Sequence, residues 1–86
     1  MYETINEQVA VLVTFHTDTQ KVRPLKMRWK NRAYVFNEVN YHFKYKRGTS
    51  LIHVFSVNDG ANYFELEYDS EGLIWMLGRV SDGQAA

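Results

Sequence analysis

The residues best suited to metal chemistry in this chain are three histidines, because the chain contains no cysteine. A structural metal site needs several ligands that converge on one point, and closely spaced ligand pairs usually mark it in a sequence. His16, His42 and His53 are widely separated. On the strand register predicted below, His53 points into the interior and His42 points outward. We therefore predict one half-buried histidine, two surface histidines and no metal site.

Other catalytic groups are equally sparse. The serines lie in predicted strands or turns, without the sharp strand-to-helix elbow that exposes a nucleophilic hydroxyl: Ser50, Ser56, Ser70 and Ser81. Glu65 and Glu67 share one face of a predicted strand at about 7 Å, a separation compatible with paired-carboxylate hydrolysis. The same spacing describes an ordinary solvated strand face. With no glycine-rich phosphate loop either, we predict a protein that is not an enzyme and carries no cofactor.

The basic residues are concentrated in one part of the chain. Nine of the ten lie in residues 21–47 beside a single acid, Glu38, so this window carries a formal charge of +8. Outside it, Arg79 stands against nine carboxylates, a charge of −8, although the whole chain is formally neutral. Charge segregation of this kind affects which partners a protein attracts rather than its fold.

A basic face is suited to the phosphate backbone of nucleic acid, which it would bind by counterion release without strong sequence specificity. We expect Tyr45 to be an accessible platform for base stacking, whereas Tyr41 and Phe43 point inward on the predicted register. The predicted nucleic-acid interface consists of Arg23, Lys26, Arg28, Lys30, Arg32, Lys44, Lys46, Arg47 and Tyr45. Two alternatives stay open: the cations attract an acidic protein, or acids such as Glu65 and Glu67 neutralise them within the molecule.

Strand patterns run along most of the chain, and no segment has a helical period. Residues 9–16 are apolar on both sides, which predicts a strand covered on both faces. Residues 25–30 alternate apolar and basic side chains and predict a half-buried strand with a basic outer face. After a turn at Asn31-Arg32, the apolar positions change phase near Asn37-Glu38, which predicts a β-bulge. Turns at residues 47–49, 58–60 and 69–72 close further hairpins. The predicted register sets Trp29 opposite Tyr34, Phe55 opposite Phe64, His53 opposite Leu66 and Tyr68 opposite Leu73.

These patterns predict one all-β domain over residues 1–86, with frayed ends at 1–6 and 81–86. Six antiparallel strands would form a meander rolled into a small barrel of SH3-like or OB-like size, either closed or partly open. The predicted interior consists of Met27, Trp29, Tyr34, Phe36, Tyr41, Phe43, Phe55, Phe64, Leu66, Trp75 and Leu77. Because 45% of the chain is hydrophobic and 15% aromatic, this core can support the fold without a disulfide.

A second candidate surface lies on the outer face of the predicted sheet and is apolar. It consists of Ile52, Val54, Ile74 and Met76. Apolar side chains gathered on an exposed face need a cover. The N-terminal strand would supply that cover within the molecule. Otherwise the patch is a surface for homodimerisation or for docking another protein.

Three segments carry a resemblance to a known family: residues 23–36 (RPLKMRWKNRAYVF), residues 58–69 with their Asn58-Asp59-Gly60 turn, and residues 73–80 (LIWMLGRV). Together they resemble small bacterial β domains of unknown function that occur alone or at the C-terminus of proteins similar to Y-family DNA polymerases. The similar pattern is a basic strand ending in Trp, a long aromatic strand, an acidic strand and a Trp strand ending in Arg. The resemblance implies a small β fold in a DNA-repair setting and no catalytic residue.

The sequence also predicts the compartment. No apolar run approaches the roughly 20 residues of a membrane span, and the first residues are too polar and acidic for a secretory signal. The absence of cysteine suits a reducing cytoplasm. We expect a cytoplasmic protein without a membrane partner or a small-molecule cofactor.

Overall fold

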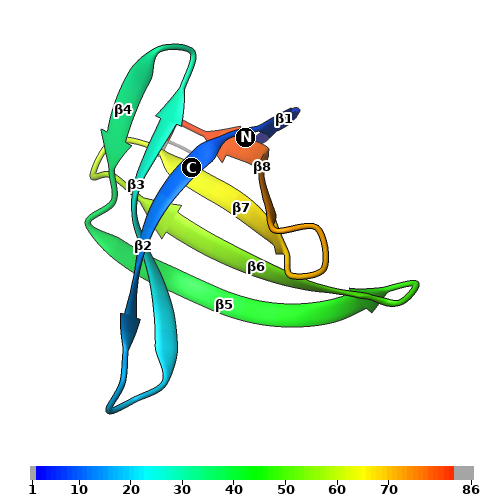
Figure 1. Ribbon diagram of the computed structural model, residues 1–86. Coiled ribbons are helices and arrows are strands. Elements are labelled where there is room, and N and C mark those ends of the chain that lie inside the picture. Colours follow the sequence, from blue (N-terminus) through cyan, green and yellow to red (C-terminus); the bar gives the residue numbers. More distant parts are fainter. Residues whose placement is uncertain (1, 83–86) are drawn as a thin grey trace.

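The computed structural model describes residues 2–82, which form eight β-strands and no helix. The strands are β1 (Tyr2–Gln8), β2 (Ala10–His16), β3 (Lys21–Trp29), β4 (Arg32–Val35), β5 (Glu38–Arg47), β6 (Ser50–Asn58), β7 (Tyr63–Asp69) and β8 (Ile74–Ser81). They make an antiparallel five-stranded sheet in the order β1-β8-β7-β6-β5 and an antiparallel three-stranded sheet in the order β2-β3-β4 (Figure 1). Within residues 2–82, no helix is long and apolar enough to cross a membrane.

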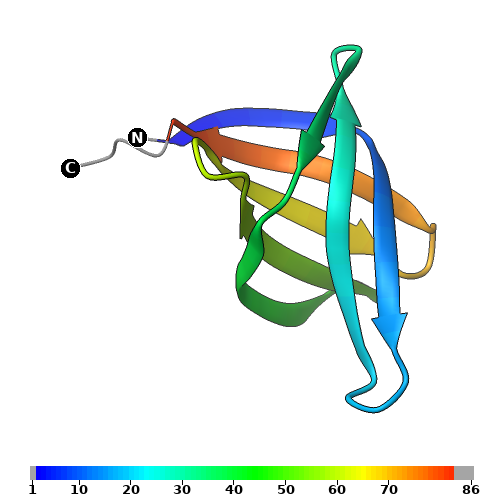
Figure 2. The same cartoon turned by 90° about the vertical axis from the view of Figure 1, so that its left-hand side faces the viewer.

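The chain passes between the two sheets at two corners. Val9 alone separates β1 from β2, and Phe36 and Asn37 separate β4 from β5. At these corners the Val9 amide donates to the carbonyl of Trp75 at 3.0 Å, and the Asn37 amide donates to the carbonyl of Asn58 at 2.7 Å. The three-stranded sheet therefore lies across one face of the five-stranded sheet (Figure 2), as in β domains whose strands change sheet at bends. We call the covered face of the five-stranded sheet its inner face and the opposite one its outer face.

The hydrophobic core lies between the two sheets. Its buried members are Met27, Phe36, Phe55, Val57, Phe64, Leu66 and Leu77. Tyr34 and Phe36 pack against Phe64, with ring centroids 5.4 and 5.6 Å apart respectively. The indole of Trp29 donates to Glu7 Oε1 at 3.1 Å, which links the three-stranded sheet to β1. Along β6 and β7, alternate side chains enter this layer, because successive residues of a strand point to opposite faces.

The predicted all-β class is confirmed, but the six-stranded meander is wrong in its strand number, and the two sheets do not close into a barrel. The phase change near Asn37 is the corner where the chain leaves the three-stranded sheet, and the β-bulge lies slightly farther on, between Val39 and Tyr41 in β5. Residues 2–6, which were expected to fray, belong to β1 and pair with β8. At the other end Ser81 still belongs to β8, and residues 83–86 lie outside the described part. Residues 9–16 are not covered on both faces, since Leu12 and Phe15 are exposed.

The hairpin registers differ from the predicted ones by two residues. Met27 lies opposite Tyr34, Val57 opposite Phe64, and Tyr68 opposite Trp75. A shift of two residues keeps every side chain on its face of the sheet, whereas a shift of one would reverse it. The predicted interior is therefore confirmed except at Tyr41 and Phe43, since its other members lie in the core cluster or pack against it.

Candidate nucleic-acid interface

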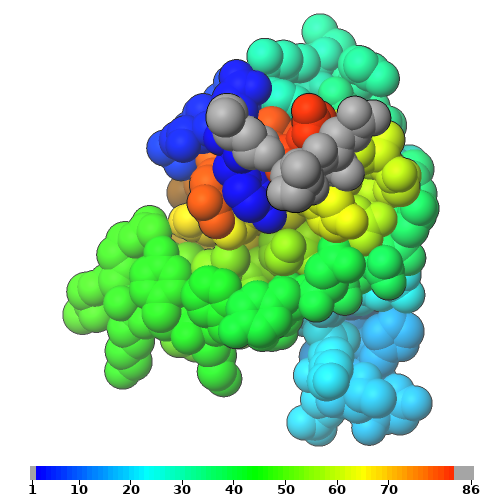
Figure 3. Space-filling model, turned by 180° about the vertical axis from the view of Figure 1, so that it is seen from behind, coloured from blue at the N-terminus to red at the C-terminus, as the bar shows by residue number. Residues whose placement is uncertain are grey.

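Strand β5 forms an edge of the five-stranded sheet and carries three exposed aromatic rings on its outer face. We call Tyr41, Phe43 and Tyr45 the aromatic ladder; they are 61%, 41% and 36% exposed. Neighbouring ring centroids lie 5.4 Å apart for Tyr41 and Phe43 and 6.4 Å apart for Phe43 and Tyr45. The surface of β5 runs along one side of the molecule in Figure 3, where it is drawn in green. The ladder therefore offers a row of accessible ring faces.

The inward direction predicted for Tyr41 and Phe43 is wrong, whereas the expected accessibility of Tyr45 is confirmed. Alternation shows that the three rings share a face, but it does not show which face of the strand is covered. A β-bulge between Val39 and Tyr41 turns the three rings to the outer face, although Val39 before it packs against the core. On the outer face, Phe43 lies opposite Val54, which is buried although it is not part of the core cluster. Sequence reasoning missed Tyr41 and Phe43 as candidate binding residues for this reason.

On the inner face, β5 presents His42, Lys44 and Lys46. The ring of His42 stacks on Phe55 at a centroid distance of 4.2 Å and an interplanar angle of 4°. Its Nε2 lies 3.2 Å from Nδ1 of His53, so one ring must donate a proton and the other accept it. The prediction that His42 points outward, away from His53, is wrong. Within residues 2–82, no three His, Cys, Asp or Glu side chains are grouped closely enough to hold a metal ion.

Partial burial is the main cause that lowers the pKa of both histidines below the ordinary value of 6.5. For His42, the positive charges of His53, Lys44 and Lys21 lower the pKa further, in that order. For His53, Lys44 is the second cause. Burial and neighbouring cations both disfavour the protonated ring. The pair is therefore held in its neutral, hydrogen-bonded form near neutral pH.

Arg47 ends the aromatic ladder on the outer face. Its guanidinium donates to the hydroxyl of Tyr45 and to Glu67 Oε1, the latter at 3.2 Å, and lies 5.6 Å from the centre of the Tyr45 ring. The hydrogen bond to Glu67, and next the one to Tyr45, raise the pKa of Arg47 above its ordinary value. Arg47 is thus a permanent cation whose charge is partly balanced by its own chain.

The structure divides the predicted interface among separate regions. Lys26 and Arg28 lie on the outer face of the three-stranded sheet, because their neighbour Met27 points into the core. Lys30 and Arg32 flank the β3–β4 turn and lie over rings of their own sheet at 4.8 and 5.3 Å. Arg23 donates to a backbone carbonyl at the β4–β5 corner at 2.9 Å. The residues that do lie together, on β5, are Lys44, Lys46, Arg47 and Tyr45.

Few of the basic side chains form an ion pair with a carboxylate of the same chain. Two ion pairs join described residues, Arg47 with Glu67 at 3.2 Å and Arg79 with Glu65 at 2.8 Å. Of the nine cations between residues 21 and 47, Arg47 alone has such a carboxylate partner within residues 2–82. The two glutamates considered above for hydrolysis therefore each hold an arginine on the outer face.

The predicted apolar patch is mostly covered, but not by the N-terminal strand. Ile52 and Val54 are only 1% and 4% exposed, and larger side chains flank them in register: Tyr45 and Asp69 beside Ile52, and Phe43 and Glu67 beside Val54. Ile74 remains exposed and Met76 is half-buried on β8. The N-terminal strand of the prediction, residues 9–16, is β2 of the three-stranded sheet on the inner face, and β1 pairs along the edge of β8, so the predicted cover is wrong. Of the predicted patch, only Ile74 and part of Met76 are accessible to a partner.

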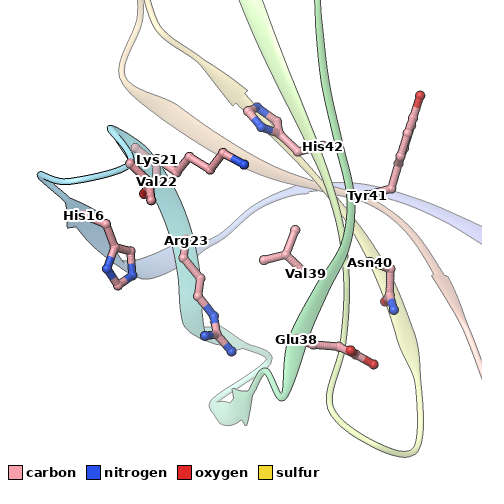
Figure 4. Close-up of a pocket in the computed structure, with 10 residues that line it drawn as sticks. His16, Lys21, Val22, Arg23, Glu38, Val39, Asn40, Tyr41 and His42 are labelled. Carbon is pink, nitrogen blue, oxygen red and sulfur yellow. The ribbon is translucent and has the colours of Figure 1, made fainter.

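A groove of about 650 Å³ separates β5 from the end of the β2–β3 hairpin. His16, Lys21, Arg23 and Glu38 line it together with residues 39–42. In Figure 4, Lys21 extends toward His42, whereas Tyr41 points to the other side of β5. The two faces of β5 therefore differ: one carries accessible rings, and the other borders a groove with several basic side chains.

Comparisons with models of protein families, with curated proteins and with solved structures found no match. The family resemblance of the three segments therefore stays an expectation.

Proposed function

We propose that this protein is a non-catalytic β module that binds single-stranded nucleic acid along β5 without strong sequence specificity. The observation that carries the proposal is the exposed aromatic ladder, whose rings alternate with Lys44 and Lys46 on an edge strand. Exposed rings on a sheet, next to cations, are the combination by which proteins hold unpaired bases. The resemblance to domains found with polymerase-like proteins favours a DNA-repair setting for this activity.

The two kinds of side chain would act on different parts of the nucleic acid. Bases stack on the rings of Tyr41, Phe43 and Tyr45, because every base has a π-face. Lys44 and Lys46 point to the opposite face of β5, but β5 has a neighbouring strand on one side only, so both can reach around the edge. Phosphates that follow this edge would meet their ammonium groups. A duplex is a poorer ligand because its bases are already stacked on one another.

Fluorescence anisotropy with a labelled oligothymidylate and with a duplex of equal length tests the proposal. We expect the single strand to bind more tightly, and Phe43→Ala to weaken it by roughly 5- to 150-fold, since base–aromatic stacking contributes about 1–3 kcal/mol per base. Leu12→Ala is the matched control, because Leu12 is an exposed apolar residue on the outer face of the other sheet. The Leu12→Ala variant should bind the oligothymidylate with the same affinity as the unchanged protein.

Two outcomes would reject the proposal. One is equal loss of affinity in Phe43→Ala and Leu12→Ala, which would mean that the ladder is not the binding surface. The other is a protein that ignores the oligonucleotide and doubles its mass in light scattering, with Phe43→Ala restoring the monomer. The ladder would then be a self-association surface, in line with the hazard that an exposed edge strand carries.

A further inference from the structure

A second cavity lies on the inner side of β5, between the five-stranded sheet and the β2–β3 hairpin. It measures about 370 Å³ and continues the groove of Figure 4, with which it shares Lys21, Val22 and His42. Its volume falls within the roughly 300–1,000 Å³ typical of small-molecule pockets. We call it the inter-sheet cleft.

Aromatic rings from four adjacent strands form one wall of the cleft. They are His42, His53, Phe55, Tyr68 and Trp75. Trp75 lies against Phe55 and Tyr68, with centroid distances of 5.5 and 4.8 Å, and His42 stacks on Phe55. Because Phe55 is itself only 2% exposed, the accessible ring surface of the wall belongs to His42, His53, Tyr68 and Trp75. Such a wall fits a flat ring, which can stack on it in an offset or tilted arrangement.

The opposite wall of the cleft is apolar, and its rim is positively charged. Val13 and Val22 face the rings from β2 and β3, and Lys21 stands at the mouth. Lys44 lies near enough for its charge to act on both histidines. Among the described residues no carboxylate lines the cleft, so these cations keep their charge available for a ligand. Arg23 and His16 extend the basic lining into the adjoining groove, where Glu38 is the acid.

We infer that the inter-sheet cleft binds a small planar aromatic anion, a ring that carries a phosphate or a carboxylate. The ring would stack on the accessible ring surface of Tyr68 and Trp75, and the anionic group would meet Lys21 at the mouth. Nucleotides and aromatic carboxylic acids share this chemistry. The site does not depend on nucleic-acid binding by the ladder, because the ladder lies on the other face of β5.

Amide and indole NMR spectra of the full chain can test the site, with adenosine 5′-monophosphate and 2-naphthoate as separate probes. We expect at least one probe to shift the indole N–H of Trp75 and the amides of Lys21 and His53. The indole of Trp29 is the internal control, because it does not line the cleft and donates to Glu7. The probe with the larger effect shows whether the site prefers phosphate or carboxylate.

Two comparisons separate the ring from the charge. Adenosine, which keeps the ring, and ribose 5-phosphate, which keeps the anion, should each bind at least about tenfold more weakly than the nucleotide, since a charge-assisted contact and a stacked ring both contribute. Lys21→Glu should weaken the better probe by about tenfold, while Lys26→Glu, the same charge change on the far side of the three-stranded sheet, should leave it unchanged. Both lysines are exposed, so neither change disturbs the core.

The inference fails if neither probe shifts Trp75, if the shifts centre on Trp29, or if Lys21→Glu and Lys26→Glu behave alike. It also fails if adenosine binds as tightly as its monophosphate. The variant Phe43→Ala should bind the probe like the unchanged protein. Loss of nucleic-acid binding by the ladder and loss of probe binding in the cleft are therefore separable results.

Discussion

The salt dependence of binding to single-stranded nucleic acid gives a quantitative test of the surface on β5. On single strands, each phosphate contact contributes a slope of about −0.7 to the plot of log affinity against log salt concentration. Lys44 and Lys46 have no carboxylate partner within the described chain, whereas Arg47 has Glu67 at 3.2 Å. Two fully effective cations predict a slope of about −1.4, and so a roughly sevenfold loss of affinity between about 50 and about 200 mM salt.

Changing these cations should move the slope in both directions. Lys44→Gln combined with Lys46→Gln should bring it close to zero. Glu67→Gln should free Arg47, steepen the slope to about −2.1 and raise the loss over the same salt range to roughly twentyfold. Anisotropy titrations at several salt concentrations, with one labelled oligothymidylate throughout, provide the slopes.

The control pair is Lys26→Gln with Arg28→Gln, which removes the same charge from the outer face of the other sheet. That pair should keep the original slope. If the Lys44 and Lys46 double variant keeps it and the control pair loses it, the phosphates follow the three-stranded sheet and the reasoning from β5 is refuted. An unchanged slope in Glu67→Gln would show that Arg47 takes no part in binding.

Two further predictions concern stability. Because the folded protein holds His42 and His53 at lowered pKa values while the unfolded chain titrates near 6.5, the unfolded state binds more protons below that pH. The urea midpoint should fall as the pH drops below about 6.5, and His53→Gln should reduce this fall; an equal fall in both proteins would contradict the paired histidines. Leu73 has a φ of 56° and is 73% exposed in the β7–β8 turn. Leu73→Gly should raise the free energy of unfolding by about 0.5–1 kcal/mol, because the left-handed conformation costs an L-residue about 1–2 kcal/mol and glycine loses part of that gain in entropy; a drop in the urea midpoint would contradict the strained turn.

Alternation alone predicted much of the core. Met27 and Trp29 were expected on one face with Tyr34 and Phe36, and all four lie in or against the core. The strand partners were wrong by two residues, since turn composition does not specify where a loop closes. The face of the sheet predicted for these side chains was nevertheless correct, because a register error of two residues leaves the direction of every side chain unchanged.

The site was predicted less well, because a charge pattern along the chain does not specify a surface in space. Lys26 and Lys44 were expected on one basic face, yet they lie on different sheets. The phase change at Asn37 fitted a bulge and a change of sheet equally well, and only the latter separates these cations. His42 and His53 showed no motif, since cross-strand contacts between β5 and β6 join residues that are distant in sequence.

The sequence by itself determined that this chain forms strands, that Tyr41, Phe43 and Tyr45 share one face of their strand, and that lysines share the other. Both properties depend on the twofold alternation of a strand, which is local. Only the tertiary structure decided which of those faces lies on the outer side of the sheet, because that depends on the β-bulge between Val39 and Tyr41 and on the side to which two corners far apart in the chain bring the three-stranded sheet. For that reason the rings predicted for the interior became the candidate surface for nucleic acid.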